Sequence, residues 1–165
     1  MSERDNNGVE VVGDFVLAVF RLNGSLIEAG NRLVMDVGLT SAWWQVLGAL
    51  DLSPVPLPVA HIARNMGLAR QSVQRIVDLL ADKGLVRFEA NPHHRRAKLV
   101  VLTDEGRAAA RAAGAKQQPW ARALAAALDP ERVAAALEVL TRMDALLTSS
   151  ASAEDDQVER KEVEV

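Results

Sequence analysis

The segment from residue 59 to residue 102 restricts the fold more than any other part of the chain. A short helical stretch from about Val59 to Met66 ends at Gly67, and a second one runs from about Ala69 to Lys83 and stops at Gly84. Glycine adopts the left-handed conformation that a sharp turn needs. Two helices separated by a few residues that include a glycine are typical of a helix-turn-helix.

Two short runs of β-branched and apolar residues follow directly, at Leu85–Ala90 and Ala97–Leu102. The polar stretch Asn91-Pro92-His93-His94-Arg95-Arg96 lies between them. This pattern predicts two antiparallel strands joined by an extended basic loop. A helix-turn-helix followed at once by such a hairpin predicts a winged helix.

Two helices are predicted before this segment. Between Val12 and Val34 the apolar residues recur at spacings of three, four or seven, which is helical periodicity. Thr40 or Ser41 is placed to cap a second helix that runs through Leu50. Residues 53–58 contain three alternating prolines, which exclude a regular helix, so we expect a loop there.

Two more helices are predicted after the hairpin. Thr103 is placed to cap the first of them, and Pro119 is expected to kink or break it. Asp129-Pro130 predicts the start of the second. The expected fold is therefore mainly α with a small β-hairpin wing, with additional helices at both ends. The polar segments 1–11 and 149–165 are predicted to be disordered.

The charge of the chain is unevenly distributed. Residues 53–107 hold nine basic and five acidic side chains, a net charge of +4, and all three histidines, whereas the whole chain has a net charge of −3. A basic segment is either an ordinary solvated face or a site for a polyanion. The overall charge excludes a uniformly basic nucleic-acid coat.

Absent residue types exclude several function classes. The chain has no cysteine, which excludes disulfides, thiol redox sensing and cysteine nucleophiles. No apolar run approaches the roughly 20 residues that span a bilayer, and residues 1–7 form a polar start without a signal-peptide core. We therefore expect a cytoplasmic protein. We expect no enzyme either, because no nucleophile–histidine–acid order, glycine-rich phosphate loop or carboxylate pair is visible.

The helix after Gly67 has the pattern of a helix that reads DNA. Val73, Ile76, Val77 and Leu80 share one face and should pack inward. Gln71, Gln74, Arg75 and Asp78 form the opposite face, and glutamine and arginine pair with adenine and guanine edges in the major groove. An amphipathic helix with ordinary solvent-facing polar residues is the alternative. Asp78 and Asp82 would repel phosphate and are expected to lie clear of the DNA backbone.

The hairpin loop adds two arginines that can reach a minor groove. The predicted DNA-contacting residues are Arg70, Gln71, Ser72, Gln74 and Arg75 on the helix and His94, Arg95, Arg96 and Lys98 in the hairpin. A metal site at His93 and His94 is not expected, because metal sites usually need three or four ligands. No cofactor is expected.

Several of these segments resemble the MarR family, the multiple-antibiotic-resistance-type regulators, over residues 12–148. The matching segments are Gly38-Leu39-Thr40 with Trp44, Leu47 and Leu50; Gly67-Leu68, Ser72-Val73, Arg75, Val77-Asp78, Leu80 and Lys83-Gly84-Leu85-Val86; and His94-Arg95-Arg96, Ala97–Val101 and Leu102-Thr103-Asp104-Glu105-Gly106. Two positions depart from the family pattern. The family's wing aspartate is His94, which cannot brace the wing arginine as an anion, and the usual serine at the start of the reading helix is Ala69.

The resemblance implies a homodimeric transcriptional regulator, usually a repressor. Residues 12–52 and 103–148 would supply dimerisation helices, and residues 53–102 the winged helix, with the reading helix at about 69–83 and the wing at about 85–102. Two-fold symmetry implies a pseudo-palindromic operator with half-sites about 10–10.5 base pairs apart.

The resemblance also implies release from DNA by a small aromatic or phenolic ligand. The residues that could line its pocket are Phe20, Trp43, Trp44, His61 and Trp120, although tryptophans at helical spacing are more often part of a core. The alternative hypothesis is that the chain is a ligand-binding or protein-interaction module on a winged-helix scaffold with little DNA binding. Ala69, His94 and the net negative charge favour that alternative.

Overall fold

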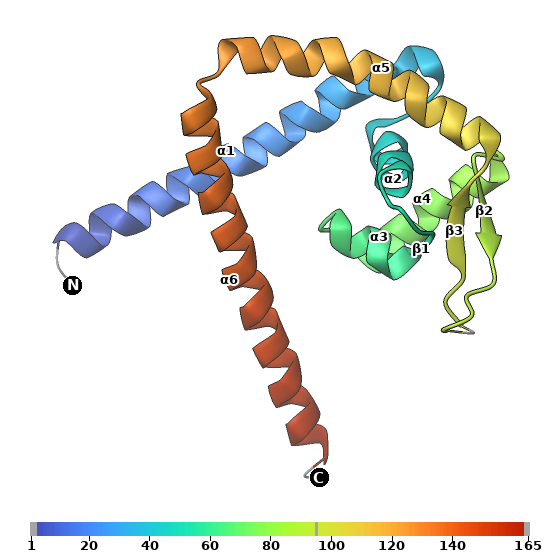
Figure 1. Ribbon diagram of the computed structural model, residues 1–165. Helices are drawn as coiled ribbons and strands as arrows, with labels where there is room; N and C mark the ends of the chain where they lie inside the picture. The colour runs from blue at the N-terminus through green and yellow to red at the C-terminus, as the bar shows by residue number, and fades with distance from the viewer. Residues whose placement is uncertain (1–2, 95, 164–165) are drawn as a thin grey trace. The chain divides into compact units, whose positions relative to one another are not determined.

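The computed structural model describes residues 3–94 and 96–163, which are mainly helical with a small sheet (Figure 1). The elements in chain order are α1 (Glu3–Val34), the 3-10 helix η1 (Met35–Val37), α2 (Ser41–Asp51), β1 (Leu57–Pro58), α3 (Val59–Asn65), α4 (Arg70–Asp82), β2 (Val86–Glu89), β3 (Leu99–Leu102), α5 (Asp104–Ala127) and α6 (Pro130–Val163). The chain divides into two compact units, Met1–Gln118 and Pro119–Val165. The predicted class, mainly α with a winged helix-turn-helix, is confirmed.

Helices α3 and α4 form the helix-turn-helix. Gly67, between them, has a φ of 61°, a conformation that costs glycine little. The Leu68 amide donates to the Ala63 carbonyl at 2.9 Å and closes the turn. At the start of α2, the Thr40 hydroxyl accepts from the Trp43 amide at 3.2 Å, as the capping prediction requires.

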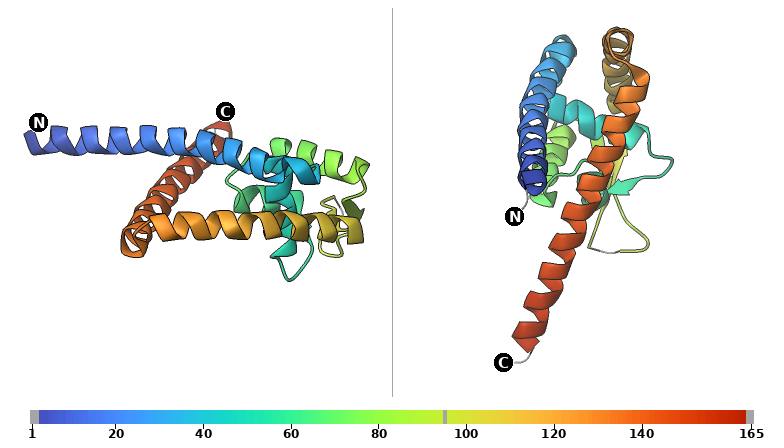
Figure 2. Two further views of the ribbon diagram at one scale, coloured as in Figure 1. Left: turned by 90° about the horizontal axis from the view of Figure 1, so that it is seen from above. Right: turned by 90° about the vertical axis from the view of Figure 1, so that its left-hand side faces the viewer.

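The wing is part of a three-stranded antiparallel sheet with the order β1-β3-β2. Val86 pairs with Leu102 and Glu89 with Leu99, so the chain between these strands forms an extended loop that projects beyond α3 and α4 (Figure 2). Strand β1 lies within residues 53–58, where the prolines predict only a loop. Its Pro58 is tolerated because β1 is an edge strand, where a missing N–H need not break a ladder.

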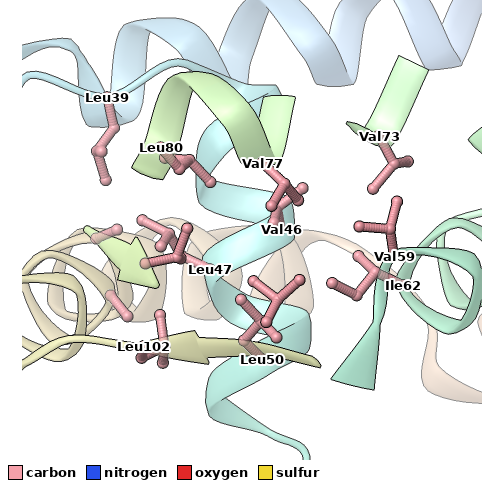
Figure 3. Close-up of a cluster of buried hydrophobic side chains, with 14 of the residues drawn as sticks. Leu39, Val46, Leu47, Leu50, Val59, Ile62, Val73, Val77, Leu80 and Leu102 are labelled. Atoms are coloured by element: carbon pink, nitrogen blue, oxygen red, sulfur yellow. The ribbon is translucent and has the colours of Figure 1, made fainter. Parts of the chain in front are cut away.

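The core of the first unit lies around α2. Figure 3 shows Val46, Leu47 and Leu50 along this helix, with side chains of α3 and α4 packed against it. Val73, Val77 and Leu80 of α4 are buried, and Ile76 is half-buried, so the predicted inward face of this helix is confirmed. Burying each such side chain stabilises the fold by about 1.5–3 kcal/mol. The opposite face of α4 is thereby fixed toward solvent.

Thr103 joins the end of α4, the wing and α5. Its hydroxyl donates to the Gly84 carbonyl at 2.7 Å and accepts from the Gly106 amide at 3.0 Å, while its own amide donates to the Leu85 carbonyl at 3.1 Å. A Cβ on Gly106 would lie 1.8 Å from the carbonyl oxygen of Leu85, so α5 packs there directly against backbone. The end of α4 and the end of the wing are thus both held by the first turn of α5.

The helix bounds differ from the sequence prediction in three places. Helix α1 begins at Glu3 and α6 extends to Val163, so both reach into segments for which disorder was predicted. The alanine, glutamate, lysine and arginine residues of the C-terminal segment are strong helix formers. Helix α5 continues across Pro119 instead of breaking there, although the boundary between the two units falls at this residue.

The start of α6 agrees with its predicted signal. The carboxylate of Asp129 accepts from the Glu131 amide at 2.9 Å, and Pro130 is the first helical residue.

Large apolar side chains are exposed along α1 of the first unit and along α6 of the second. On α1 they are Val9, Val11, Val12, Leu17, Phe20, Leu22, Leu26 and Ile27. On α6 they are Val133, Leu137, Val139, Leu140, Leu146 and Leu147. In the described part of the chain, no helix combines the length and the apolar character that a membrane crossing requires.

Candidate nucleic-acid interface

The solvent face of α4 carries the polar residues that the sequence analysis assigned to DNA reading. Arg70, Gln71, Ser72 and Arg75 are exposed in the first half of the helix. Ala69 occupies the N-cap position, and no side chain caps this helix end. The missing hydroxyl therefore leaves the start of α4 without a side-chain acceptor of its own.

Gln74 is held by the carboxylate of Asp78. Its side-chain nitrogen donates to Asp78 Oδ1 at 2.8 Å, one turn further along the helix. An amide group has one acceptor oxygen and two N–H donors, so the carbonyl oxygen and the second N–H of Gln74 remain for another partner. This is the pair of groups with which glutamine reads adenine.

The loop of the wing is organised by Asn91. Its side-chain oxygen accepts from the His93 amide at 3.0 Å, and its carbonyl accepts from the His94 amide at 3.3 Å. His94, Arg96 and Lys98 are exposed, and the Lys98 ammonium lies 5.8 Å from the centre of the Phe88 ring. Arg96 has no carboxylate partner in the described part of the chain. Arg95 lies outside the described residues.

A cleft of about 760 Å³ lies between α3, α4 and the wing, and we call it the wing cleft. Its apolar lining is formed by residues 55–60 together with Phe88 and Leu99. Its charged and hydrogen-bonding lining consists of His61, Arg64, Arg70, Gln74, Asp78, Asn91, His93, His94, Arg96 and Lys98. Asp78 is the one carboxylate among the described lining residues, against four permanently cationic side chains. The wing cleft is therefore a positively charged hollow beside the exposed face of α4.

Two members of this cleft were not foreseen as part of the interface. Arg64 was not singled out from the sequence, although it lies three residues after His61 and so shares a face of α3 with it. Asp78, which is predicted to lie clear of the DNA backbone, lines the cleft with Gln74. The packing of α3 against β1 and α4, and of α4 against β2, brings these residues beside the hairpin.

The five residues proposed for a ligand pocket do not share one cleft. Phe20 is 68% exposed on α1, and Trp43 is half-buried against the core, with the Lys83 ammonium 5.3 Å from its ring centre. His61 lines the wing cleft. Trp120 belongs to the second compact unit.

Trp44 lines a second hollow of about 800 Å³, which we call the α2 cleft. Its lining comes from α2, from the start of the loop that follows α2, from the end of α3 and from Gln117 of α5. The indole of Trp44 and the side chains of Leu52 and Met66 make much of this lining apolar. An apolar hollow with a few polar groups is suited to a small organic molecule.

A metal centre has no support in the described residues, which contain no group of three or more histidine, aspartate or glutamate side chains placed to hold an ion. The pKa of Asp36 is lowered by a hydrogen bond from the Lys116 ammonium, which ties η1 to α5. The pKa of Asp104 is lowered by a hydrogen bond from Arg107 at 2.8 Å. Both carboxylates lie outside the wing cleft.

Comparison with known proteins agrees with this geometry. A sequence model described as "MarR family" matches residues 37–97. An uncharacterized protein of Mycobacterium tuberculosis is 35% identical over 132 residues, which cover 80% of this chain and 91% of that protein.

Two solved structures are informative about ligands. The M. tuberculosis transcriptional regulator MosR, in complex with DNA, is 26% identical with a TM-score of 0.66, covering 76% of this chain and 91% of that one. CouR from Rhodococcus jostii, bound to p-coumaroyl-CoA, is 25% identical with a TM-score of 0.68, covering 77% of this chain and 89% of that one.

Proposed function

This chain belongs to the MarR family of winged-helix transcription regulators, and on that premise we propose that it is a homodimeric repressor of a pseudo-palindromic operator. The observation that carries the proposal is the wing cleft, a cationic hollow that adjoins the exposed polar face of α4. A helix face that can read bases and a cationic surface that can bind phosphates are the two requirements of a specific DNA-binding protein.

In this proposal α4 enters the major groove and the wing follows the DNA backbone. Gln71, Ser72 and Arg75 face the bases from the first half of the helix, the part that contacts base edges in helix-turn-helix proteins. Arg96 and Lys98 on the wing lie on the backbone or in the adjacent minor groove. Support comes from MosR, a similar protein whose structure contains DNA.

The homodimer is supported by the exposed apolar side chains of α1 and α6. Leu17 and Phe20 on α1 and Leu137 and Leu147 on α6 are each more than half exposed in the single chain. Apolar surface of this extent is normally covered in a soluble protein. A two-fold dimer places two reading helices on one face of DNA, with half-sites about one helical turn apart.

The effector proposal concerns the α2 cleft. We propose that a small aromatic or phenolic molecule binds there beside Trp44 and releases the DNA. The support is the volume and apolar lining of the cleft and the ligand present in the CouR structure. Trp44→Ala should abolish the ligand response and leave DNA binding by the ligand-free protein within about threefold of the starting value.

The test of DNA binding uses a fluorescent duplex from the region upstream of the protein's own coding sequence, with a scrambled duplex as control. Tight, selective binding that weakens with salt is the expected result. Arg75→Ala should relax base preference by about 1–3 kcal/mol, whereas Arg96→Ala should weaken binding to both duplexes.

Unchanged binding by both variants would refute the assignment of these residues. If neither duplex binds, a selection from random duplexes decides between a distant operator and the alternative of a module that does not bind DNA. Enrichment of one sequence supports the regulator, and no enrichment refutes it.

A further inference from the structure

All three histidines of the chain line the wing cleft, although they come from separate segments. His61 is on α3, and His93 and His94 are in the loop between β2 and β3. The three side chains are exposed, so they are accessible to solvent and to a ligand. The remaining surface of the chain therefore carries no histidine.

The charges around the histidines favour an anion. Helix α3 contributes Arg64, α4 contributes Arg70 and Asp78, and the wing contributes Arg96 and Lys98. Residues 55–60, which also line the cleft, are Val-Pro-Leu-Pro-Val-Ala and carry no charge. Four cations surround one carboxylate, and that carboxylate already accepts a hydrogen bond from Gln74.

We propose that the wing cleft is a proton-linked phosphate site, in which His61, His93 and His94 bind the DNA backbone in their protonated form. This inference rests on the proposed function and adds to it a set of backbone contacts and a dependence on pH. Histidine is the side chain whose charge changes close to neutral pH. A phosphate oxygen beside an imidazole favours its charged form, so DNA binding draws protons onto the histidines.

The sign of the effect follows from this proton uptake. A complex that holds more protons than the free protein is stabilised as pH falls, so affinity for DNA rises between pH 8 and pH 6. An average uptake of one proton changes the dissociation constant about tenfold per pH unit.

The phosphate contacts carry no base sequence, so the effect appears with any duplex. The test therefore uses the full-length protein and a fluorescent mixed-sequence duplex of about 30 base pairs, at one low ionic strength. Dissociation constants are measured at pH 6.0, 7.0 and 8.0 by anisotropy. Calorimetry in two buffers of different ionisation enthalpy gives the number of protons taken up.

Two variants separate proton linkage from simple loss of charge. The first combines His61→Gln, His93→Gln and His94→Gln, which keeps polar side chains of similar size but removes their titration. The second, Arg64→Gln, removes a permanent cation from the same cleft. Since all four side chains are exposed, both variants should keep the circular dichroism spectrum and melting temperature of the parent.

We expect the dissociation constant of the parent protein to fall at least about tenfold from pH 8.0 to pH 6.0, and that of the triple variant to change by less than about twofold. Arg64→Gln should weaken binding at every pH and keep the parent's ratio. The same pH ratio in the parent and the triple variant would overturn the inference and leave the proposed function intact. No binding of any duplex by the parent at any pH would overturn both.

Discussion

Replacing Gly106 with alanine should damage the fold through one backbone contact. The added Cβ would lie 1.8 Å from the carbonyl oxygen of Leu85, 2.9 Å from its carbonyl carbon and 3.2 Å from a methyl group of Leu102. A displacement of about 1.2 Å is needed to bring the first distance to 3.0 Å, which is still shorter than an ordinary carbon–oxygen contact of about 3.3 Å.

The neighbouring atoms have little freedom to make room. The Leu85 carbonyl accepts a hydrogen bond from the Thr103 amide, and the Thr103 hydroxyl is bonded both to Gly84 and to the Gly106 amide. Overpacking a fitted site costs about 1–3 kcal/mol, and this contact is with backbone, so we expect a loss of about 3 kcal/mol. For a chain of this size the melting temperature should fall by roughly 6–12 °C.

Gly114→Ala is the matched control, because it lies on the same helix and a Cβ there meets no atom within 4 Å. Alanine is the better helix former by about 0.5–1 kcal/mol, so this variant should be slightly more stable than the parent. Urea denaturation followed by circular dichroism, at equal protein concentrations, measures both changes. A Gly106→Ala protein as stable as the parent would refute the close approach of α5 to Leu85.

Three further predictions concern other contacts. Thr103→Val should lower the free energy of unfolding, measured in urea, by about 1–2 kcal/mol, because the Gly84 carbonyl and the Gly106 amide each lose a hydrogen bond to the Thr103 hydroxyl. An unchanged denaturation midpoint would contradict a stabilising role of this hydroxyl. Asp78→Asn should strengthen binding to a random duplex by about two- to threefold in anisotropy titrations, since it removes a carboxylate from the wing cleft. Unchanged binding would place Asp78 away from the DNA backbone. Lys116→Met should slightly lower the denaturation midpoint at pH 7 and lower it less in acid: the pKa of Asp36 is lowered by Lys116, so this contribution is present above the unfolded pKa of about 3.9 and is lost as pH falls through the lowered folded pKa. An equal decrease at both pH values would refute the charge pair.

Local signals in the sequence were enough to predict the helix-turn-helix and the helix before it. The glycine at position 67, the cap at Thr40 and the inward stripe of Val73, Val77 and Leu80 act over one or two helical turns, and the structure reproduces each of them. The wing strands followed from two short β-type runs and the basic loop between them.

Features that depend on distant pairing were not predictable in this way. Strand β1 exists because Leu57 and Pro58 pair with β3 more than 40 residues later, and the prolines around them indicate only a loop. The membership of Arg64 and Asp78 in the wing cleft depends on how α3 and α4 pack beside the hairpin. His61 and Trp44, both assigned to a ligand pocket from their residue type, line two different clefts, because residue type alone does not bring side chains together.

The junction at Thr103 also determines how motion can reach the DNA. Helix α5 begins beside the last turn of α4 and the last residue of the wing, and it continues to Ala127. When the amino-terminal half of α5 moves, α4 and the wing must follow as one rigid body. In the proposed dimer, an effector that displaces α5 therefore changes the separation of the two reading helices and leaves the face of each unchanged. The effector then releases DNA because the separation of the two α4 helices no longer matches the separation of the two half-sites. Inserting or deleting a base pair between the half-sites should therefore mimic the effector.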